Sequence, residues 1–432
     1  MNSGLSTKNA PSASVVLPHY VYGALAFLAA SIMIFFSADN LSSSFIGPRL
    51  LGLTHMLVLG WITMLIFGAL YQLIPVVMEV KLFSEKMTYF SFITLGIGNI
   101  LLTGDFWHNY TMPKTLTIIG GVLVVFSILV FVVNTLLTAK KSPVKTTENN
   151  YIVTSIFWLL FTVIMGLFIL LNNKYHYTVL SPIEMLKAHA AIGLIGWFSM
   201  LVMGVASTLL PMFFIVHNLN KNYLKASFVL TNIGLAVLFV SLIFGVSYWV
   251  SYISAISIII GIFLFARYNW DAYNRRLRRK LDVGMKLSVL SFILLGISAI
   301  GSILMFLAPL FFPQMMNIYI IVFGASLLLG FFTSLILGQM YKTLPFIVWL
   351  AKYQDKVGKF KTPLPADLYS EKLAQGHYYS FVVGIAIFLL GVFMQSALII
   401  KISSLLFTIT AILFLYNTLM IILHKEDLKP LK

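Results

Sequence analysis

GWITMLIFGALYQLIP occupies residues 60–75, GWFSMLVMGVASTLLP residues 196–211, and GFFTSLILGQMYKTLP residues 330–345. Each stretch begins with a glycine and an aromatic residue, has a second glycine eight positions later, and ends in a proline. On an ideal α-helix the two glycines lie about 80° apart around the axis, close enough to one face for a neighbouring helix to approach. We interpret nine residues as helix-packing positions, with each proline loosening its helix: Gly60, Gly68, Pro75, Gly196, Gly204, Pro211, Gly330, Gly338 and Pro345.

The composition around these stretches is that of a membrane protein. The chain has 432 residues, of which 60% are hydrophobic and 10% charged, and its mean hydropathy is +0.96. Soluble domains carry about 25% charged residues. The apolar runs approach the ~20 residues that cross a bilayer core. We therefore expect twelve transmembrane helices, at about 20–37, 50–77, 88–103, 114–138, 151–171, 184–215, 224–243, 246–267, 285–312, 317–349, 378–397 and 402–423.

The three glycine stretches fall in the second, sixth and tenth expected spans, each four helices after the last. This spacing predicts an all-α integral membrane protein with one membrane domain, residues 1–432, built as three four-helix repeats in a pseudo-threefold arrangement. The expected repeats are 19–140, 151–268 and 285–424.

The distribution of charge predicts the orientation of the chain. The net charge is +16, but the basic residues gather on one side of the expected spans. The opposite side has only Arg49, Lys114, Lys174, Lys187 and Lys401, while Lys342 lies within a span. By the positive-inside rule both termini are cytoplasmic. The cluster 275–280 is then an orientation signal that meets anionic lipid, and we expect no nucleic-acid partner.

Few residues remain that could carry chemistry inside the bilayer. The chain has no cysteine, which excludes disulfides, thiolate metal sites and covalent c-type haem. All thirteen carboxylates fall in loops or at span ends, so we expect no buried carboxylate to relay protons. Lys342 is expected to extend toward the cytoplasmic end, and its repeat equivalents, Gln72 and Thr208, leave a polar column open as an alternative.

Two histidines are expected inside spans, His55 and His189, both in the outer part of central helices. The other six are assigned to the cytoplasmic side (His19, His217, His377, His424) or to outer loops (His108, His176). Imidazole is the commonest metal ligand, and haem needs one or two axial groups from the protein. The alternative is a histidine hydrogen-bonded to a neighbouring helix. Met56, Met112 and Met185 are thioether candidates for copper, although methionine in apolar runs is ordinary packing.

These features together resemble subunit I of the haem–copper oxidase superfamily. His55, Gly68, Tyr71 and Pro75 follow a spacing similar to that of C-family oxidases and nitric oxide reductases, and residues 189–193, HAAIG, resemble the start of their sixth span. The resemblance implies that His55 is an axial haem ligand and that His189 matches a copper ligand.

The chain also departs from that family. Residues 323–326, FGAS, contain no histidine where the tenth span should ligate both haems, and residues 225–241 contain none where the seventh should ligate copper. The resemblance therefore implies a divergent member, comparable to the NnrS-type membrane proteins associated with nitric oxide stress, and not a complete terminal oxidase.

Two functions follow as hypotheses. The first is a protein of the bacterial cytoplasmic membrane that binds b-type haem, but not copper, through His55 and His189. In this hypothesis His55 is an axial ligand and His189 is either a second ligand or a distal group. The protein would act in respiratory electron transfer or in handling nitric oxide or another diatomic gas, with the lipid bilayer and other respiratory-chain subunits as partners. The second is a haem-free scaffold, assembly factor, or metal or small-solute transporter that retains the fold.

Overall fold

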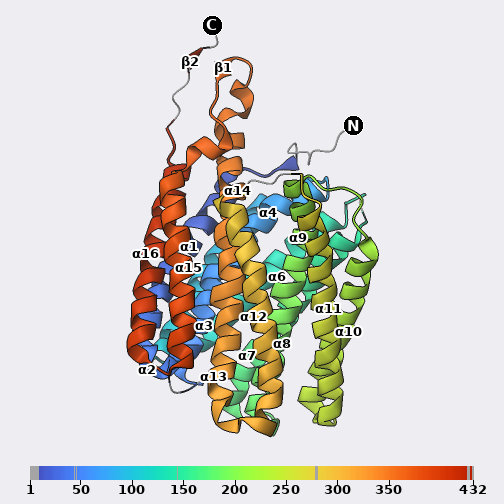
Figure 1. Ribbon diagram of the computed structural model, residues 1–432, viewed down its shortest axis with the longest axis vertical. Helices are drawn as coiled ribbons and strands as arrows, with labels where there is room; N and C mark the ends of the chain where they lie inside the picture. The colour runs from blue at the N-terminus through green and yellow to red at the C-terminus, as the bar shows by residue number, and fades with distance from the viewer. Residues whose placement is uncertain are drawn as a thin grey trace. The chain divides into compact units, whose positions relative to one another are not determined.

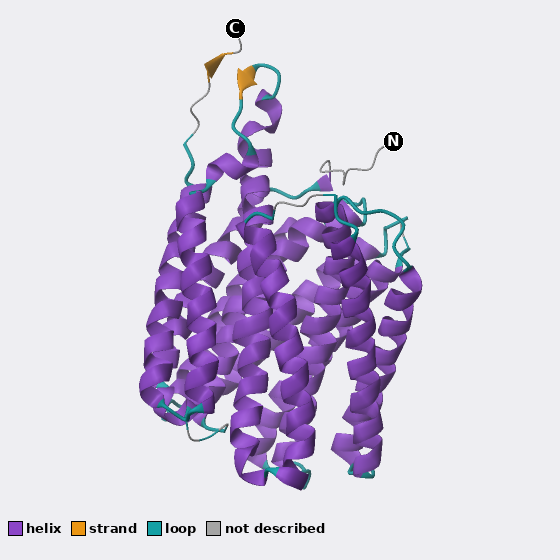
Figure 2. Cartoon of the chain, in the orientation of Figure 1, coloured by secondary structure: helices purple, strands orange, loops and turns teal. Residues whose placement is uncertain are grey.

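The computed structural model describes residues 9–42, 44, 46–143, 145–277, 281–425, 429 and 430. Helices make up most of this part of the chain (Figure 2). Twelve of them are long and apolar enough to cross a membrane, which confirms the predicted number of spans. The uninterrupted spans are α1 (Ala13–Phe36), α5 (Glu85–Trp107), α6 (Lys114–Ala139), α7 (Thr147–Tyr175), α10 (Lys221–Phe244), α11 (Tyr248–Asn274), α12 (Val283–Phe311), α15 (Glu371–Phe393) and α16 (Ala397–Ile422).

The three spans that carry the glycine stretches change helix type partway along. Each has an α-helix, then a π-helical segment, then a second α-helix. The first glycine of each stretch lies within the π-helical segment. The three sets are α3 (Pro48–His55), η2 (Met56–Thr63) and α4 (Met64–Val77); α8 (Pro182–Ala191), η3 (Ile192–Ser199) and α9 (Met200–Phe214); α13 (Met316–Ala325), η5 (Ser326–Phe332) and α14 (Thr333–Tyr353).

The chain forms two compact units. One comprises Ile74–Thr94 and Gly121–Lys280, and within it α10 and α11 pack side by side as a hairpin (Figure 1). The other comprises Pro11–Leu73, Leu95–Gly120 and Leu281–Lys432, and within it α16 packs against both α1 and α15 (Figure 1). His189 belongs to the first of these units and His55 to the second.

The glycines of each stretch pack against the span that precedes it. A Cβ atom added at any of them would lie 2.6–3.2 Å from a side chain of that neighbouring helix, so only glycine allows the approach. The contacted residues are Ala26 and His19 on α1 for Gly60 and Gly68, Trp158 and Tyr151 on α7 for Gly196 and Gly204, and Leu294 and Leu287 on α12 for Gly330 and Gly338.

These contacts give the π-helical segments a physical explanation. The two glycines of a stretch are eight residues apart, whereas the residues that they meet on the neighbouring helix are seven apart in all three cases. A π-helical turn accommodates one residue more than an α-helical turn. The extra residue is taken up there, which turns both glycines toward the same neighbour instead of the 80° separation expected for a regular α-helix.

In two of the π-helical segments a side-chain hydroxyl donates a hydrogen bond to a backbone carbonyl. Ser199 Oγ donates to Leu194 O at 2.8 Å, and Thr333 Oγ1 donates to Leu328 O at 2.8 Å. In both cases the acceptor is the carbonyl five residues earlier. A widened turn disturbs the regular backbone ladder, and these buried hydroxyls supply a donor to a carbonyl within it.

Two helices begin earlier than their hydropathy indicates, and this corrects the placement of two histidines. α1 begins at Ala13 and α15 at Glu371, so His19 and His377 lie inside helices, with exposed fractions of 1% and 0%. For α15 the cause is the N-cap: Ser370 Oγ accepts from Leu373 N and starts the helix in a polar stretch. The prediction that only His55 and His189 lie within spans was wrong.

The expectation that no carboxylate is buried was also wrong. Asp105, near the end of α5, is 2% exposed and accepts hydrogen bonds from Thr117 Oγ1 at 2.5 Å and Met112 N at 3.1 Å. Glu148, in the first turn of α7, is 6% exposed and pairs with Lys221 at 2.9 Å. Both lie at span ends as predicted, where a loop or a neighbouring helix covers them.

A small sheet joins two distant parts of the second unit. β1 (Phe360–Lys361), in the connection between α14 and α15, pairs antiparallel with β2 (Lys429–Pro430) (Figure 2). The connection is further held by Trp349 Nε1, which donates to Pro363 O at 2.6 Å.

Candidate functional site

His55 is the last residue of α3, directly before the π-helical segment η2. Its Nδ1 lies 2.8 Å from Leu51 O, one turn earlier in the same helix. A carbonyl can only accept, so Nδ1 carries the proton and the lone pair of the ring resides on Nε2. The ring is partly buried and lies 5.3 Å from the Phe106 ring, centroid to centroid. His55 therefore presents one available ligand atom, Nε2, in a fixed ring orientation.

A buried polar group of α5, Asn99, packs against η2. Asn99 Nδ2 donates to Tyr22 Oη at 3.2 Å and lies 3.6 Å from Met56 Sδ. Tyr22 Oη in turn donates to Gly96 O at 3.1 Å. Asn99 Oδ1 is buried and has no hydrogen-bond partner among the described residues. The Met56 thioether, one of the copper candidates, thus serves as an acceptor in a hydrogen-bonded cluster.

The aromatic neighbours of His55 continue into the loop after α5. Phe106 meets Tyr110 at a centroid distance of 5.7 Å. Burial raises the pKa of Tyr110, and the negative charge of Asp105 raises it further. Tyr110 is therefore a neutral phenol at neutral pH.

His189 repeats the arrangement of His55 in the first unit. Its Nδ1 lies 3.0 Å from Thr162 O, a carbonyl of α7, so Nε2 is again the atom with the lone pair. The ring packs against Gly166, where an added Cβ would lie 2.9 Å from Cε1. Met185, one turn before His189, is fully buried in an apolar cluster with Ile192 and Leu235, as expected of a packing methionine.

Two further buried histidines escaped the sequence reasoning because hydropathy placed them outside the spans. His377 stacks on Tyr341 at 5.2 Å with an interplanar angle of 16°, and neither ring nitrogen has a hydrogen-bond partner among the described residues. His19 packs against Gly68 and meets Tyr71 at 5.7 Å. An N-capping serine at residue 370 was the sequence signal that could have placed His377 inside a helix.

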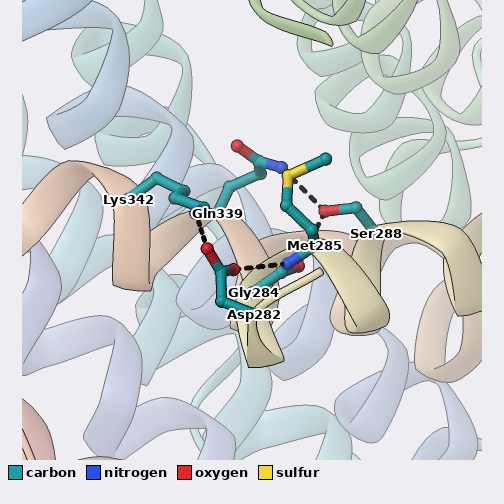
Figure 3. A network of polar contacts seen from close by, with 6 residues as sticks. All are labelled: Asp282, Gly284, Met285, Ser288, Gln339 and Lys342. Carbon is teal, nitrogen blue, oxygen red and sulfur yellow. Dashed lines mark hydrogen bonds and ion pairs between the residues drawn. The ribbon is translucent and has the colours of Figure 1, made fainter. Parts of the chain in front are cut away.

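Lys342 forms an ion pair with Asp282, the N-cap of α12 (Figure 3). The other oxygen of Asp282 accepts from Met285 N at 3.1 Å. Close by, Gln339 Nε2 donates to Ser288 Oγ at 2.7 Å (Figure 3). The ammonium group of Lys342 thus meets a carboxylate at the start of the neighbouring helix. This cluster joins α12 to α14 at the point where Gly284 and Gly338 cross.

No three His, Asp or Glu side chains gather into a possible metal site within the ranges that the structure describes. What the chain offers in each unit is one imidazole with Nδ1 held by a backbone carbonyl, His55 or His189. One or two imidazoles suffice for haem, whereas a copper centre needs several ligands together.

Comparison with known proteins identifies the family. The family model described as Cytochrome C and Quinol oxidase polypeptide I matches residues 24–246, which is more than half of the chain. None of the curated proteins matches. A solved chain of a haem–copper terminal oxidase dimer, determined by cryo-EM, superimposes with a TM-score of 0.63 at 11% identity, covering 96% of this chain and 84% of that chain. The structural match shows the shared fold, and the family match assigns membership. This chain belongs to the Cytochrome C and Quinol oxidase polypeptide I family, as a divergent protein that resembles subunit I of the haem–copper oxidases.

Proposed function

We propose that this protein binds b-type haem through His55 and acts in respiratory electron transfer or in the handling of nitric oxide or another diatomic gas. The observation that carries the proposal is the hydrogen bond from His55 Nδ1 to Leu51 O. Histidines that ligate metals characteristically donate their other ring N–H to a carbonyl or carboxylate, which fixes the tautomer and the ring plane. Haem, when bound, would supply the reversible one-electron or gas-binding chemistry.

The surroundings of His55 suit this role. Phe106 covers one side of the ring, and the neutral Tyr110 extends the apolar wall. An apolar setting excludes water and keeps the imidazole neutral, which a ligand must be. Within the first unit, Thr162 O holds Nδ1 of His189 in the same way, which supports His189 as a candidate haem ligand or as a group near a bound gas.

The residues present do not fit the copper part of an oxygen-reducing centre. Residues 323–326 and 225–241 lack the histidines that the family resemblance requires there. We therefore assign no oxygen reduction to this chain. A haem-free scaffold, assembly factor or transporter is the alternative function.

The finer architecture belongs to the same proposal. Three four-helix repeats are supported by the shared offsets of the glycine contacts, because residues 19 and 26, 151 and 158, and 287 and 294 occupy equivalent places on α1, α7 and α12. Cytoplasmic termini, a bacterial inner membrane and contacts with other respiratory subunits are supported by the charge distribution and by the family.

The test is an optical one. The full chain is produced with an ample haem supply and purified, and its reduced-minus-oxidised spectrum and extracted haem are measured beside those of His55→Ala and His108→Ala. His108 is an exposed histidine in the loop after α5, so it controls for the loss of an imidazole.

We expect about one haem per chain in the parent and in His108→Ala, and a loss of at least tenfold in His55→Ala. Absence of haem from the folded parent protein would overturn the proposal and leave the scaffold or transporter function. Haem retained in His55→Ala but lost in His189→Ala would move the ligand to the first unit.

A further inference from the structure

The end of α11 carries two arginines for which the described residues provide no carboxylate. Arg267, two turns earlier on the same helix, is paired with Asp271 at 2.7 Å, and Lys221 is paired with Glu148 at 2.9 Å. Arg275 and Arg276 make no such pair within the described ranges. Their positive charge is therefore available to an anion.

The fold holds these two arginines in place. The Arg276 guanidinium lies 3.8 Å above the centre of the Tyr273 ring, and its Nη1 donates to Tyr273 O at 2.6 Å. Its Nε is buried and has no hydrogen-bond partner among the described residues. The Arg275 side chain donates through Nη1 to Asn218 O at 3.4 Å. Arginine binds phosphate through two parallel N–H groups, and stacking on an aromatic ring orients that fork.

A backbone contact fixes the segment after α11 to the end of α9. Leu277 N donates to Phe214 O at 3.1 Å, and the Phe214 ring meets Tyr273 edge-on at 6.0 Å. This contact makes the site a junction between two connections, residues 215–220 and 275–277, both within the first unit. The backbone that carries the two arginines is thus tied to the end of α9.

The position of Arg275 and Arg276 along α11 matches the depth of the lipid headgroups in a bilayer. α11 is the least buried of the twelve spans, and it carries exposed aromatic residues at both ends, Trp249 at 61% and Trp270 at 59%. The stretch between these tryptophans is about 32 Å long, close to the ~30 Å of a hydrocarbon core. Tryptophan is enriched at the membrane interface, so Arg275 and Arg276, just beyond Trp270, stand at the level of the lipid phosphates.

Two exposed apolar side chains lie on the same two connections. Leu277 is 72% exposed, and Ile215 is 50% exposed on the neighbouring connection. A free inorganic anion would leave these apolar side chains exposed to water, whereas a phospholipid covers them with its glycerol and acyl groups. The combination of cation, aromatic ring and exposed apolar side chains favours a lipid over a soluble anion.

We propose that Arg275 and Arg276, with Tyr273 and Trp270, form a binding site for the phosphate of an anionic phospholipid. The site is separate from the haem proposal and does not depend on it. It goes beyond an orientation signal, because it requires these particular guanidinium groups and not merely positive charge on this side of the membrane.

The experiment uses the purified full chain and two lipids of equal chain length, dioleoyl phosphatidylglycerol and dioleoyl phosphatidylcholine. Bound lipid is counted by native mass spectrometry for the parent, Arg276→Gln, Arg275→Gln and Arg267→Gln. The last variant removes the same charge from the same helix but from a guanidinium already engaged by Asp271. Size-exclusion elution and thermal midpoint check that every variant is folded.

We expect phosphatidylglycerol to bind in preference to phosphatidylcholine, and to weaken about fivefold in Arg275→Gln and in Arg276→Gln. Arg267→Gln should leave binding within about twofold of the parent. Equal losses in all three variants would reduce the effect to surface charge and overturn the proposal. Displacement of the lipid by inorganic phosphate at the lipid's own concentration would overturn it too, since the ligand would then be the free anion.

Discussion

His377 buries an imidazole whose ring nitrogens have no hydrogen-bond partner among the described residues, and it stacks on Tyr341. Burial of an unsatisfied polar atom destabilises a fold by about 1–3 kcal/mol. The same ring face would pack against Tyr341 if the side chain were a phenyl group. The contribution of His377 to stability should therefore lie in its shape and not in its nitrogens.

His377→Phe should accordingly unfold at the same temperature as the parent or up to a few degrees higher. The measurement is thermal unfolding of the detergent-solubilised chain, with Tyr341→Leu as the companion variant that removes the stack and should lower the midpoint. A clear drop in His377→Phe would contradict this account and indicate that a ring nitrogen binds a group of its own.

Gly338 decides how closely two elements, α12 and α14, approach. A Cβ atom at this position would lie 2.5 Å from Gly284 O and 3.0 Å from Leu287 Cβ, so backbone would have to move. Gly338→Ala should lower the free energy of unfolding by about 1–3 kcal/mol. Gly324→Ala, on α13 of the same span, is the matched control because nothing lies within 4 Å of its added methyl group.

Thermal unfolding of both alanine variants checks this. Gly324→Ala should be neutral or slightly stabilising, since alanine is the better helix former by about 1 kcal/mol. A midpoint of Gly338→Ala equal to that of Gly324→Ala would mean that the crossing of α12 and α14 is not tight. The ion pair between Lys342 and Asp282 beside this crossing would then be the main link between the two helices.

The segment η2 contains one residue more than its neighbour α1 requires. Deletion of Ile62 would make Gly60 and Gly68 seven residues apart, equal to the spacing of His19 and Ala26 that they meet. We expect the deletion to convert η2 to α-helix and to leave the protein folded. Deletion of the exposed Leu25 from α1 would instead enlarge the mismatch and should prevent folding.

Both deletions are compared with the parent by expression level, monodisperse elution and thermal midpoint. A folded, monodisperse Ile62 deletion and a Leu25 deletion that does not fold are the expected pair of results. The opposite pair would show that the extra residue is not taken up in η2.

At the scale of the whole molecule, an even number of spans and the basic bias predict both termini on the cytoplasmic side. Single cysteines at Ala10 and at Val179, a fully exposed residue between α7 and α8, provide the test. A membrane-impermeant maleimide applied to intact cells should label position 179 and should reach position 10 only after permeabilisation. Labelling of position 10 in intact cells would reverse the proposed orientation.

The number of spans and the glycine packing could be predicted because they depend on composition and on spacing along one helix. The start of α15 could not be read from hydropathy, since Ser370 begins it with a hydrogen bond in a polar stretch. The burial of Asp105 depends on a loop that folds over it. Local contacts such as His55 with Leu51 follow from helix geometry, whereas the partner of His189, Thr162, is 27 residues away and required the fold.

The π-helical segments illustrate the same boundary between local and long-range information. The mismatch of one residue involves contacts that Gly60 and Gly68 make with a different helix, α1. The recurrence of the seven-residue spacing on three neighbouring helices adds structural support to the repeat proposal. The contacts between two helices that are distant in sequence form only in the folded protein, so one helix alone does not reveal them.

The pairing of β1 with β2 has a consequence for the order of events during biosynthesis. Residues 360 and 361 leave the ribosome well before residues 429 and 430, which pair with them in the sheet. Between those two moments α15 and α16 must be inserted into the membrane. The sheet can therefore form only after α15 and α16 have been synthesised. Resistance of the connection after α14 to protease would then report that membrane insertion of the chain is complete.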